Sequence, residues 1–205
     1  ENAMYCAPGR NPLYSEHAQW IPQYTVEEVM RRHAQSLPGV ELRFGCELLG
    51  ITQDAHGVTA RLRDVRSNAE NTVRADFLVG ADGARSTVRE AIGAKLEGAY
   101  GLSRNYNVVF RAPGLAQAHT HGPAIMYWQV NGDAPSLIGP MDRGDKWFFM
   151  PTGVREGWKL DAAQAPAMIR QATGIDLPYE VLSTDEWVAS RFLGDFYSDR
   201  RVFLA

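Results

Sequence analysis

Between Val26 and Leu37, apolar residues recur every three or four positions, which predicts an amphipathic helix with one face in a core. Thr25 and Glu28 stand three residues apart in the order of a capping box, so the helix is expected to begin at Thr25. Pro38-Gly39 supplies the stop. From Val40 to Phe44 apolar and charged residues alternate, which predicts a half-buried strand.

Extended segments separated by polar turns follow this helix. Residues 48–51 are predicted to be extended, residues 58–63 alternate between apolar and polar, and Val73 lies beyond a further polar turn. This order predicts an antiparallel hairpin. The continuous apolar run at 75–81 is typical of a strand buried on both faces in a layered α/β domain.

Beyond Gly101, aromatic residues gather in short runs broken by polar turns, which predicts an antiparallel meander. The runs are 106–110, 125–130, 137–138 and 147–150. A short helix is expected at 167–173, where Gly174 stops it, and a mostly extended segment at 180–192.

These patterns predict an α/β (α+β) fold in two parts. Residues 1–98 are expected to form part of a layered α/β domain, and residues 99–192 a mostly antiparallel β-sheet domain. Residues 193–205 return toward the first domain, ending in an apolar run that has the pattern of a strand just begun. We therefore expect the chain to be a segment of a longer protein.

Composition narrows the class of protein. The chain has 205 residues, 45% of them hydrophobic and 22% charged, which excludes disorder, collagen and coiled coil. With 21 Lys and Arg against 24 Asp and Glu, no positive field gathers phosphates, so nucleic acid is not an expected partner. No apolar run approaches the ~18 residues that span a bilayer, and no secretory signal is visible. A cytoplasmic location is expected, and the oligomeric state stays open.

Two cysteines, Cys6 and Cys46, lie far apart in unlike contexts. They have no ligand spacing, and free thiols are expected, although the sequence alone leaves a disulfide open. His119 and His121 alternate as metal ligands on a strand would, but no acidic or Cys partner lies close, so no metal site is expected.

The candidate chemistry lies in residues 77–89, a buried strand followed by a glycine-flanked aspartate and a helix start that carries Ser86 and Arg89. Gly80 and Gly83 allow close approach of the backbone to a ligand, and Asp82 stands at the carboxyl end of a strand, where open α/β sheets bind cofactors. The alternative is a tight turn in which Asp82 caps the helix and Arg89 forms a surface ion pair.

The whole 77–89 string closely resembles the DG fingerprint of the class A flavoprotein monooxygenases, the p-hydroxybenzoate hydroxylase family. The resemblance implies that Asp82, followed by Gly83, contacts FAD and lies near the path of the nicotinamide nucleotide. It implies also that Ser86 and Arg89 hold the loop.

Two further positions are similar to the family pattern. Gln23 stands where the family has a Gln or Arg that hydrogen-bonds the flavin cofactor, and Leu48 or a neighbour would line the adenine side. The last strand, 201–205, resembles the one that leads into the family's GD fingerprint. That fingerprint and the glycine-rich dinucleotide loop are absent from this sequence, so residues 1–98 correspond to part of a FAD-binding domain.

The resemblance implies a FAD-dependent, NAD(P)H-using hydroxylase of a phenol-like substrate. Reduced flavin would capture dioxygen as a C4a-hydroperoxide and transfer its distal oxygen to the ring. Two alternatives stay open, a flavin-dependent reductase or dehydrogenase on the same scaffold and a cofactor-free binding domain.

Aromatic residues of the meander are candidates for the substrate pocket as a group, although any single one of them is more often a core residue. The candidates are Tyr127, Trp147 and Phe149, with Met150 beside them. In this division the first part of the chain faces the cofactor and the meander faces the substrate.

Overall fold

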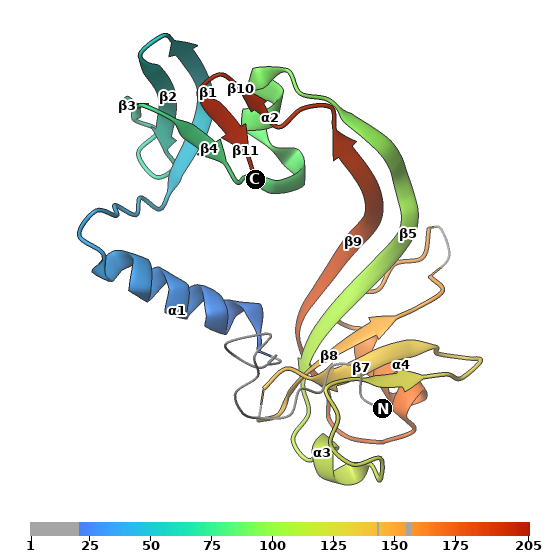
Figure 1. The fold of residues 1–205 in the computed structure, drawn as a ribbon. Coiled ribbons are helices and arrows are strands. Elements are labelled where there is room, and N and C mark those ends of the chain that lie inside the picture. Colours follow the sequence, from blue (N-terminus) through green and yellow to red (C-terminus); the bar gives the residue numbers. More distant parts are fainter. Residues whose placement is uncertain (1–20, 143, 155–156) are drawn as a thin grey trace, which may run out of the picture. The chain divides into compact units, whose positions relative to one another are not determined.

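The computed structural model describes residues 21–142, 144–154 and 157–205, which divide into two compact units (Figure 1). The aromatic-core unit comprises the described part of Glu1–Ala34 together with Ser103–Val188, and the Asp82 unit comprises Gln35–Leu102 and Ala189–Ala205. The predicted α/β (α+β) class with mostly antiparallel sheets is confirmed. The domain limits predicted at 98 and 192 fall inside two long strands, β5 (Leu96–Arg111) and β9 (Glu180–Gly194), which run through both units.

The aromatic-core unit is built on a five-stranded sheet with the order β6-β7-β8-β5-β9. The three short strands are β6 (Tyr127–Gln129), β7 (Ser136–Pro140) and β8 (Lys146–Pro151), each antiparallel to its neighbour. The predicted meander is therefore confirmed. Two helices accompany the sheet, α3 (Leu115–Ala118) and α4 (Ala165–Thr173), and Gly174 ends α4 in the left-handed region as predicted.

Cross-strand register separates the two faces of this sheet. Tyr127 pairs with Ile138, Ile138 with Phe149, and Phe149 with Val108, so these four side chains share one face. This helix-bearing face forms the core with Leu115 of α3 and Ile169 of α4. The opposite side of the sheet is called the open face here, and the neighbouring positions of the strands form two rows on it. One row consists of Trp128, Leu137 and Met150, and the other of Gly139, Phe148 and Val109.

The Asp82 unit contains the predicted hairpin as a three-stranded meander, β1 (Cys46–Asp54), β2 (Gly57–Asp64) and β3 (Glu70–Ala75). A smaller sheet has the order β10-β11-β4, in which β11 (Val202–Leu204) runs parallel to β4 (Leu78–Gly80) and antiparallel to β10 (Ser198–Asp199). The 3-10 turn η1 (Gly83–Arg85) and helix α2 (Thr87–Ile92) follow β4. The small core consists of Val58, Val88 and Val202.

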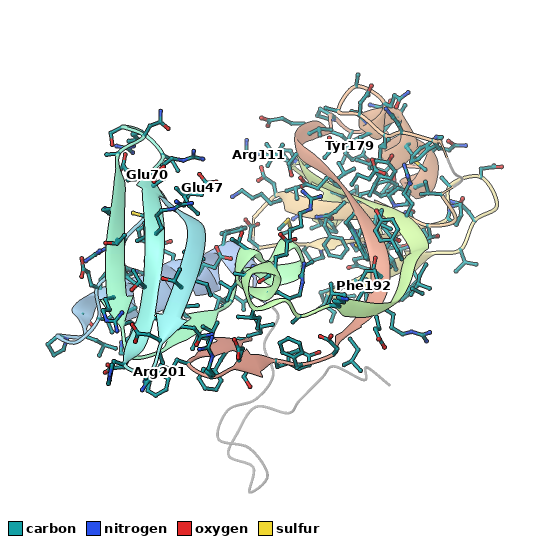
Figure 2. All side chains as sticks on the ribbon, turned by 90° about the horizontal axis from the view of Figure 1, so that it is seen from above. Glu47, Glu70, Arg111, Tyr179, Phe192 and Arg201 are labelled. Atoms are coloured by element: carbon teal, nitrogen blue, oxygen red, sulfur yellow. The ribbon has the colours of Figure 1, made fainter. Side chains whose placement is uncertain are left out.

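Polar contacts fix the β10-β11 hairpin against the meander. Gln53 donates to the Asp199 carboxylate at 2.8 Å and accepts from the Arg201 N–H at 3.1 Å. The Arg201 guanidinium, labelled in Figure 2, donates to the carbonyls of Ala55 and Asp76 at 2.7 and 3.1 Å. These bonds join residues between 125 and 148 positions apart in the sequence.

Three predictions of local structure are wrong. Helix α1 (Gln23–Ser36) begins two residues before Thr25, because the Pro22 carbonyl already accepts from the N–H groups of Thr25 and Val26. None of its residues is buried, and Met30 is 65% exposed, so its apolar stripe does not form a core. Residues 40–44 form no strand, and their apolar side chains are exposed, so alternation alone did not produce a half-buried strand.

The run at 75–81 also departs from prediction. Its strand, β4, is only three residues long, and Phe77 and Val79 are exposed. Strand β4 pairs through β11 and packs Leu78 against the small core, so only one of its faces is covered. No helix in the described ranges is long and apolar enough to cross a membrane.

Candidate functional site

The Asp82 loop is a compact hydrogen-bonded turn between β4 and α2. The Asp82 carboxylate accepts from the Ser86 hydroxyl and, at 3.1 Å, from the Val88 N–H. The Ser86 hydroxyl in turn accepts from the Arg89 N–H at 2.9 Å, which makes Ser86 the N-cap of α2. The Arg89 side chain donates to the Ala84 carbonyl at 2.8 Å. Ser86 and Arg89 therefore do hold the loop.

This arrangement keeps Asp82 charged. Burial by itself raises the pKa of the Asp82 carboxyl, but the hydrogen bonds from Ser86 and the Val88 N–H outweigh it, so the pKa lies below its usual value. Each carboxylate oxygen can accept about two hydrogen bonds. The N–H groups of Asp82 and Thr87 also lower the pKa, and the Asp82 residue is exposed, so its carboxylate stays accessible to a hydroxyl of a ligand.

The two glycines beside Asp82 serve different purposes. A Cβ on Gly80 would lie 2.6 to 2.9 Å from side-chain atoms of Val88, so Gly80 allows α2 to pack on β4 and the space beside it is not open to a ligand. Gly83 has a φ of +71°, and nothing lies within 4 Å of the position that a Cβ would take, so its backbone conformation is what requires glycine. The predicted ligand approach is therefore wrong for Gly80.

Leu48 belongs to the same unit as Asp82. Its side chain is half-buried and packs against the small core that contains Val88, the second residue of α2. Gln23 belongs to the aromatic-core unit, in the first turn of α1, where its exposed amide donates to Glu27 at 2.8 Å. Leu48 and the helix that follows the Asp82 loop therefore pack on the same small core.

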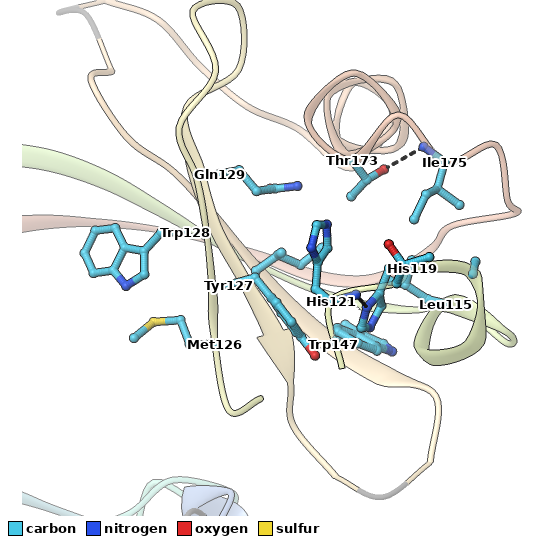
Figure 3. A pocket seen from close by; sticks show the side chains of 13 residues that line it. Leu115, His119, His121, Met126, Tyr127, Trp128, Gln129, Trp147, Thr173 and Ile175 are labelled. Atoms are coloured by element: carbon cyan, nitrogen blue, oxygen red, sulfur yellow. Dashed lines mark hydrogen bonds between the residues drawn. The ribbon is translucent and has the colours of Figure 1, made fainter. Parts of the chain in front are cut away.

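A cavity of about 550 Å³ lies on the helix-bearing face of the five-stranded sheet (Figure 3). Tyr127 and Trp147, both predicted as substrate contacts, line it with their rings 6.4 Å apart and inclined by 29°. His119 and His121 lie beside them, stacked at 6.0 Å. From the sequence these histidines were considered only as metal ligands, and among the described residues no cluster suited to a metal ion occurs.

Phe149, the third predicted contact, has a different environment. It is fully buried in the core of the helix-bearing face and does not line the cavity. Its neighbours Phe148 and Met150 project to the open face, as does Trp128, which is 69% exposed. Sequence reasoning missed Trp128 and Phe148, and it grouped Met150 with the residues of the opposite face. The two-residue period of a strand could have separated these sets.

The first turn of α1 lies on the open side of the sheet. Lys146 shares the open face with Phe148, two residues on, and its Nζ lies 5.5 Å from the centre of the Tyr24 ring. Gln23 precedes Tyr24 directly, so the predicted flavin contact lies on the open side.

The chain is similar to known proteins over most of its length. The family described as FAD binding domain matches residues 10–205. A putative polyketide hydroxylase of Streptomyces halstedii is 36% identical over 188 residues, which cover 89% of this chain and 34% of that protein. A 2,4-dichlorophenol 6-monooxygenase of Delftia acidovorans is 31% identical over 199 residues, covering 89% of this chain and 32% of that protein.

Solved structures are similar as well. The flavin-dependent monooxygenase PieE, in complex with FAD and substrate, has a TM-score of 0.80 and 29% identity, covering 90% of this chain and 33% of its own. A ternary complex of aklavinone-11 hydroxylase with FAD and aklavinone has a TM-score of 0.76 and 28% identity, covering 90% and 36%. The chain spans about a third of the length of these proteins.

Proposed function

We propose that this chain, which belongs to the FAD binding domain family, is part of a monooxygenase. The proposed reaction is the hydroxylation of a phenol-like aromatic ring. The observation that carries the proposal is the Asp82 loop, whose charged carboxylate is held by Ser86 and the Val88 N–H and stays exposed. The similarity of the chain to hydroxylases and monooxygenases, over about nine-tenths of the chain's length, favours an enzyme that transfers oxygen over a reductase.

The residues of the loop suit FAD. An anionic acceptor at the end of β4 can bind a ribityl or ribose hydroxyl, and left-handed Gly83 turns the backbone beside it. Leu48 would serve the adenine side, and Gln23 would hydrogen-bond the flavin cofactor from the start of α1. When bound, FAD would supply electron transfer from NAD(P)H and the activation of dioxygen.

The reacting ring is proposed to lie on the open face of the five-stranded sheet. Oxygen transfer requires the ring and the flavin to be in contact, and Gln23 lies next to Tyr24 on the open side. Trp128, Phe148 and Met150 offer apolar surface there. Phe148 lies against Gly139, where a Cβ would come within 2.9 Å of the phenyl ring, so the glycine lets this ring pack on the backbone.

These residues have two tasks in the reaction. They orient the ring and exclude water from it. Dioxygen and NAD(P)H as co-substrates, and the cytoplasm as location, are part of the same proposal.

The test uses the full-length protein with NADH or NADPH, dioxygen and a panel of phenols, with product mass as the readout. We expect incorporation of one oxygen atom into the ring. Phe148→Ala should change which phenols are hydroxylated, or divert NAD(P)H oxidation into peroxide, at unchanged flavin content. NAD(P)H oxidation without any oxygenated product from any phenol would favour the reductase alternative, and a full-length protein without flavin absorbance would favour the binding domain.

A second arm tests the cofactor contact. Asp82→Ala should weaken FAD binding by roughly 10- to 150-fold, since a hydrogen bond to a charged group contributes about 1.5 to 3 kcal/mol. Ser86→Ala is the matched control, because it removes the N-cap of α2 but keeps the carboxylate. Equal losses in the two variants would mean that Asp82 only supports the helix.

A further inference from the structure

The cavity on the helix-bearing face is not accounted for by the proposed reaction. The open face carries the proposed ring contacts, whereas Tyr127 and Trp147 project to the other side of the same sheet. Met126 and Trp128 also line it, but from the other side of strand β6 (Figure 3). With about 550 Å³, the cavity is within the ~300 to 1,000 Å³ typical of small-molecule sites.

Four aromatic rings, those of His119, His121, Tyr127 and Trp147, lie together in the cavity wall. The Tyr127 ring lies 4.9 Å from the His119 ring in an edge-to-face arrangement, and Trp147 lies 6.3 Å from His119 in another. Leu115, Ile138 and Ile175 complete the apolar surface. Rings set at these distances and angles suit a flat guest that can stack on one wall and meet the edge of another.

The polar groups of the wall are largely engaged. The Tyr127 hydroxyl donates to the Gly122 carbonyl at 2.6 Å and accepts from the Ala124 N–H at 3.0 Å. The Thr173 hydroxyl donates to the Ile169 carbonyl at 2.8 Å and accepts from the Ile175 N–H at 3.2 Å. Neither hydroxyl therefore has its proton free for a guest.

The two imidazoles and the Thr120 hydroxyl, for which no hydrogen bond to another described residue is seen, are the exceptions. Nδ1 of His119 accepts from the His121 N–H at 3.3 Å, so in the neutral ring the proton is on Nε2, which can donate to a guest. The His121 side chain makes no hydrogen bond to any other residue in the described part of the chain. Among the described residues, no Asp, Glu, Lys or Arg lines the cavity, which disfavours cations and phosphorylated guests alike.

We propose that this cavity is a second binding site, for a flat phenol-type aromatic molecule whose ring oxygen accepts from the His121 side chain. The cavity is separate from the site of the reacting ring on the open face. This separation rests on the proposed function, whereas the binding of an aromatic molecule in the cavity does not. Tyr127 and Trp147 thus remain proposed ring contacts, but of a ring that is not the one being oxidised.

The experiment measures binding without turnover. Oxidised full-length holoprotein is equilibrated with 2,4-dichlorophenol in the absence of NAD(P)H, and the bound probe per flavin is determined by equilibrium dialysis. We expect two bound molecules for the wild type. His121→Leu should remove one, and Ala118→Trp, which fills the cavity from α3, should remove the same one. Phe148→Ala should weaken the other.

A matched control is His56→Leu, which changes an exposed histidine in the other unit and should leave two bound molecules. One bound molecule in the wild type would overturn the second site, as would two in both cavity variants with normal flavin content and circular dichroism. Should Ala118→Trp fail to fold, His121→Leu decides alone. Two bound molecules with no oxygenated product would overturn the proposed function and leave the second site intact.

Discussion

The interior of each unit is stabilised by a different kind of contact. The aromatic-core unit buries large side chains such as Phe110 and Phe149 completely, and α4 packs Ile169 into the same core. The Asp82 unit has three small buried valines, while Phe77 and Phe203 stay exposed with their rings 6.2 Å apart. The first unit therefore depends on packed volume.

The second unit depends on directional contacts instead. Gln53 and Arg201 fix its hairpin through hydrogen bonds, and Gly80 lets α2 approach β4. Such contacts set positions accurately but bury little apolar surface. Substitutions should therefore act through lost volume in one unit and through altered geometry in the other.

The largest effect is expected for Phe149→Ala. Removal of a fully buried phenyl ring leaves a cavity and costs about 3 to 5 kcal/mol in free energy of unfolding. Phe148→Ala, one residue earlier on the half-covered open face, is the matched control and should cost no more than about 1.5 kcal/mol. Urea denaturation of the full-length protein, with hydrogen exchange on β8, gives both values. Equal losses would mean that the two faces of the sheet do not differ as described.

Much of this architecture follows from sequence pattern. The β1-β2-β3 hairpin system, the aromatic meander and the Gly174 stop were all predicted, because alternation and turn residues are local signals. The resemblance to the class A flavoprotein monooxygenases, carried by the string around Asp82, is confirmed.

The errors about which face is buried share one physical cause. A periodic pattern reveals that an element has an apolar side, but which side another element covers depends on tertiary packing. For this reason α1 was predicted to be partly buried, and the sequence did not show that Phe149 lies in the core while Phe148 projects to the open face. The His119 and His121 rings beside Tyr127 depend on how the loop before β6 folds back, which spacing does not encode.

Gly80→Ala should have a smaller effect, confined to the Asp82 unit. The added methyl would lie 2.6 Å from Val88 Cβ, and its β-branched side chain cannot swing away, so α2 must shift at a cost of about 1 to 3 kcal/mol. Faster hydrogen exchange in α2 and reduced flavin content are the expected readouts. Gly50→Ala is the control, since nothing lies within 4 Å of its Cβ position. Unchanged exchange in Gly80→Ala would show that Val88 adapts without moving the helix.

The smallest effect concerns an exposed ion pair of the Asp82 unit. The Arg74 guanidinium donates to both oxygens of Asp54 at 2.8 and 2.9 Å and, with the His56 N–H, lowers the pKa of Asp54 to about 2. A carboxyl whose pKa is lowered in the folded state stabilises the fold when the pH is above the ordinary pKa of 3.8. This contribution is lost as the pH falls toward 2.

Asp54→Asn should therefore flatten the dependence of stability on pH between about 4 and 2. The measurement is the urea midpoint at pH 5 and at pH 3, compared with Asp133→Asn, which removes an exposed carboxylate in the aromatic-core unit. The change between the two pH values should be smaller for Asp54→Asn than for the control, because only Asp54 has a partner that its protonation releases. Since solvent screens an exposed pair, the difference should be slight. Identical changes in both variants would mean that the Asp54–Arg74 contact, although bidentate, does not help to hold the meander together.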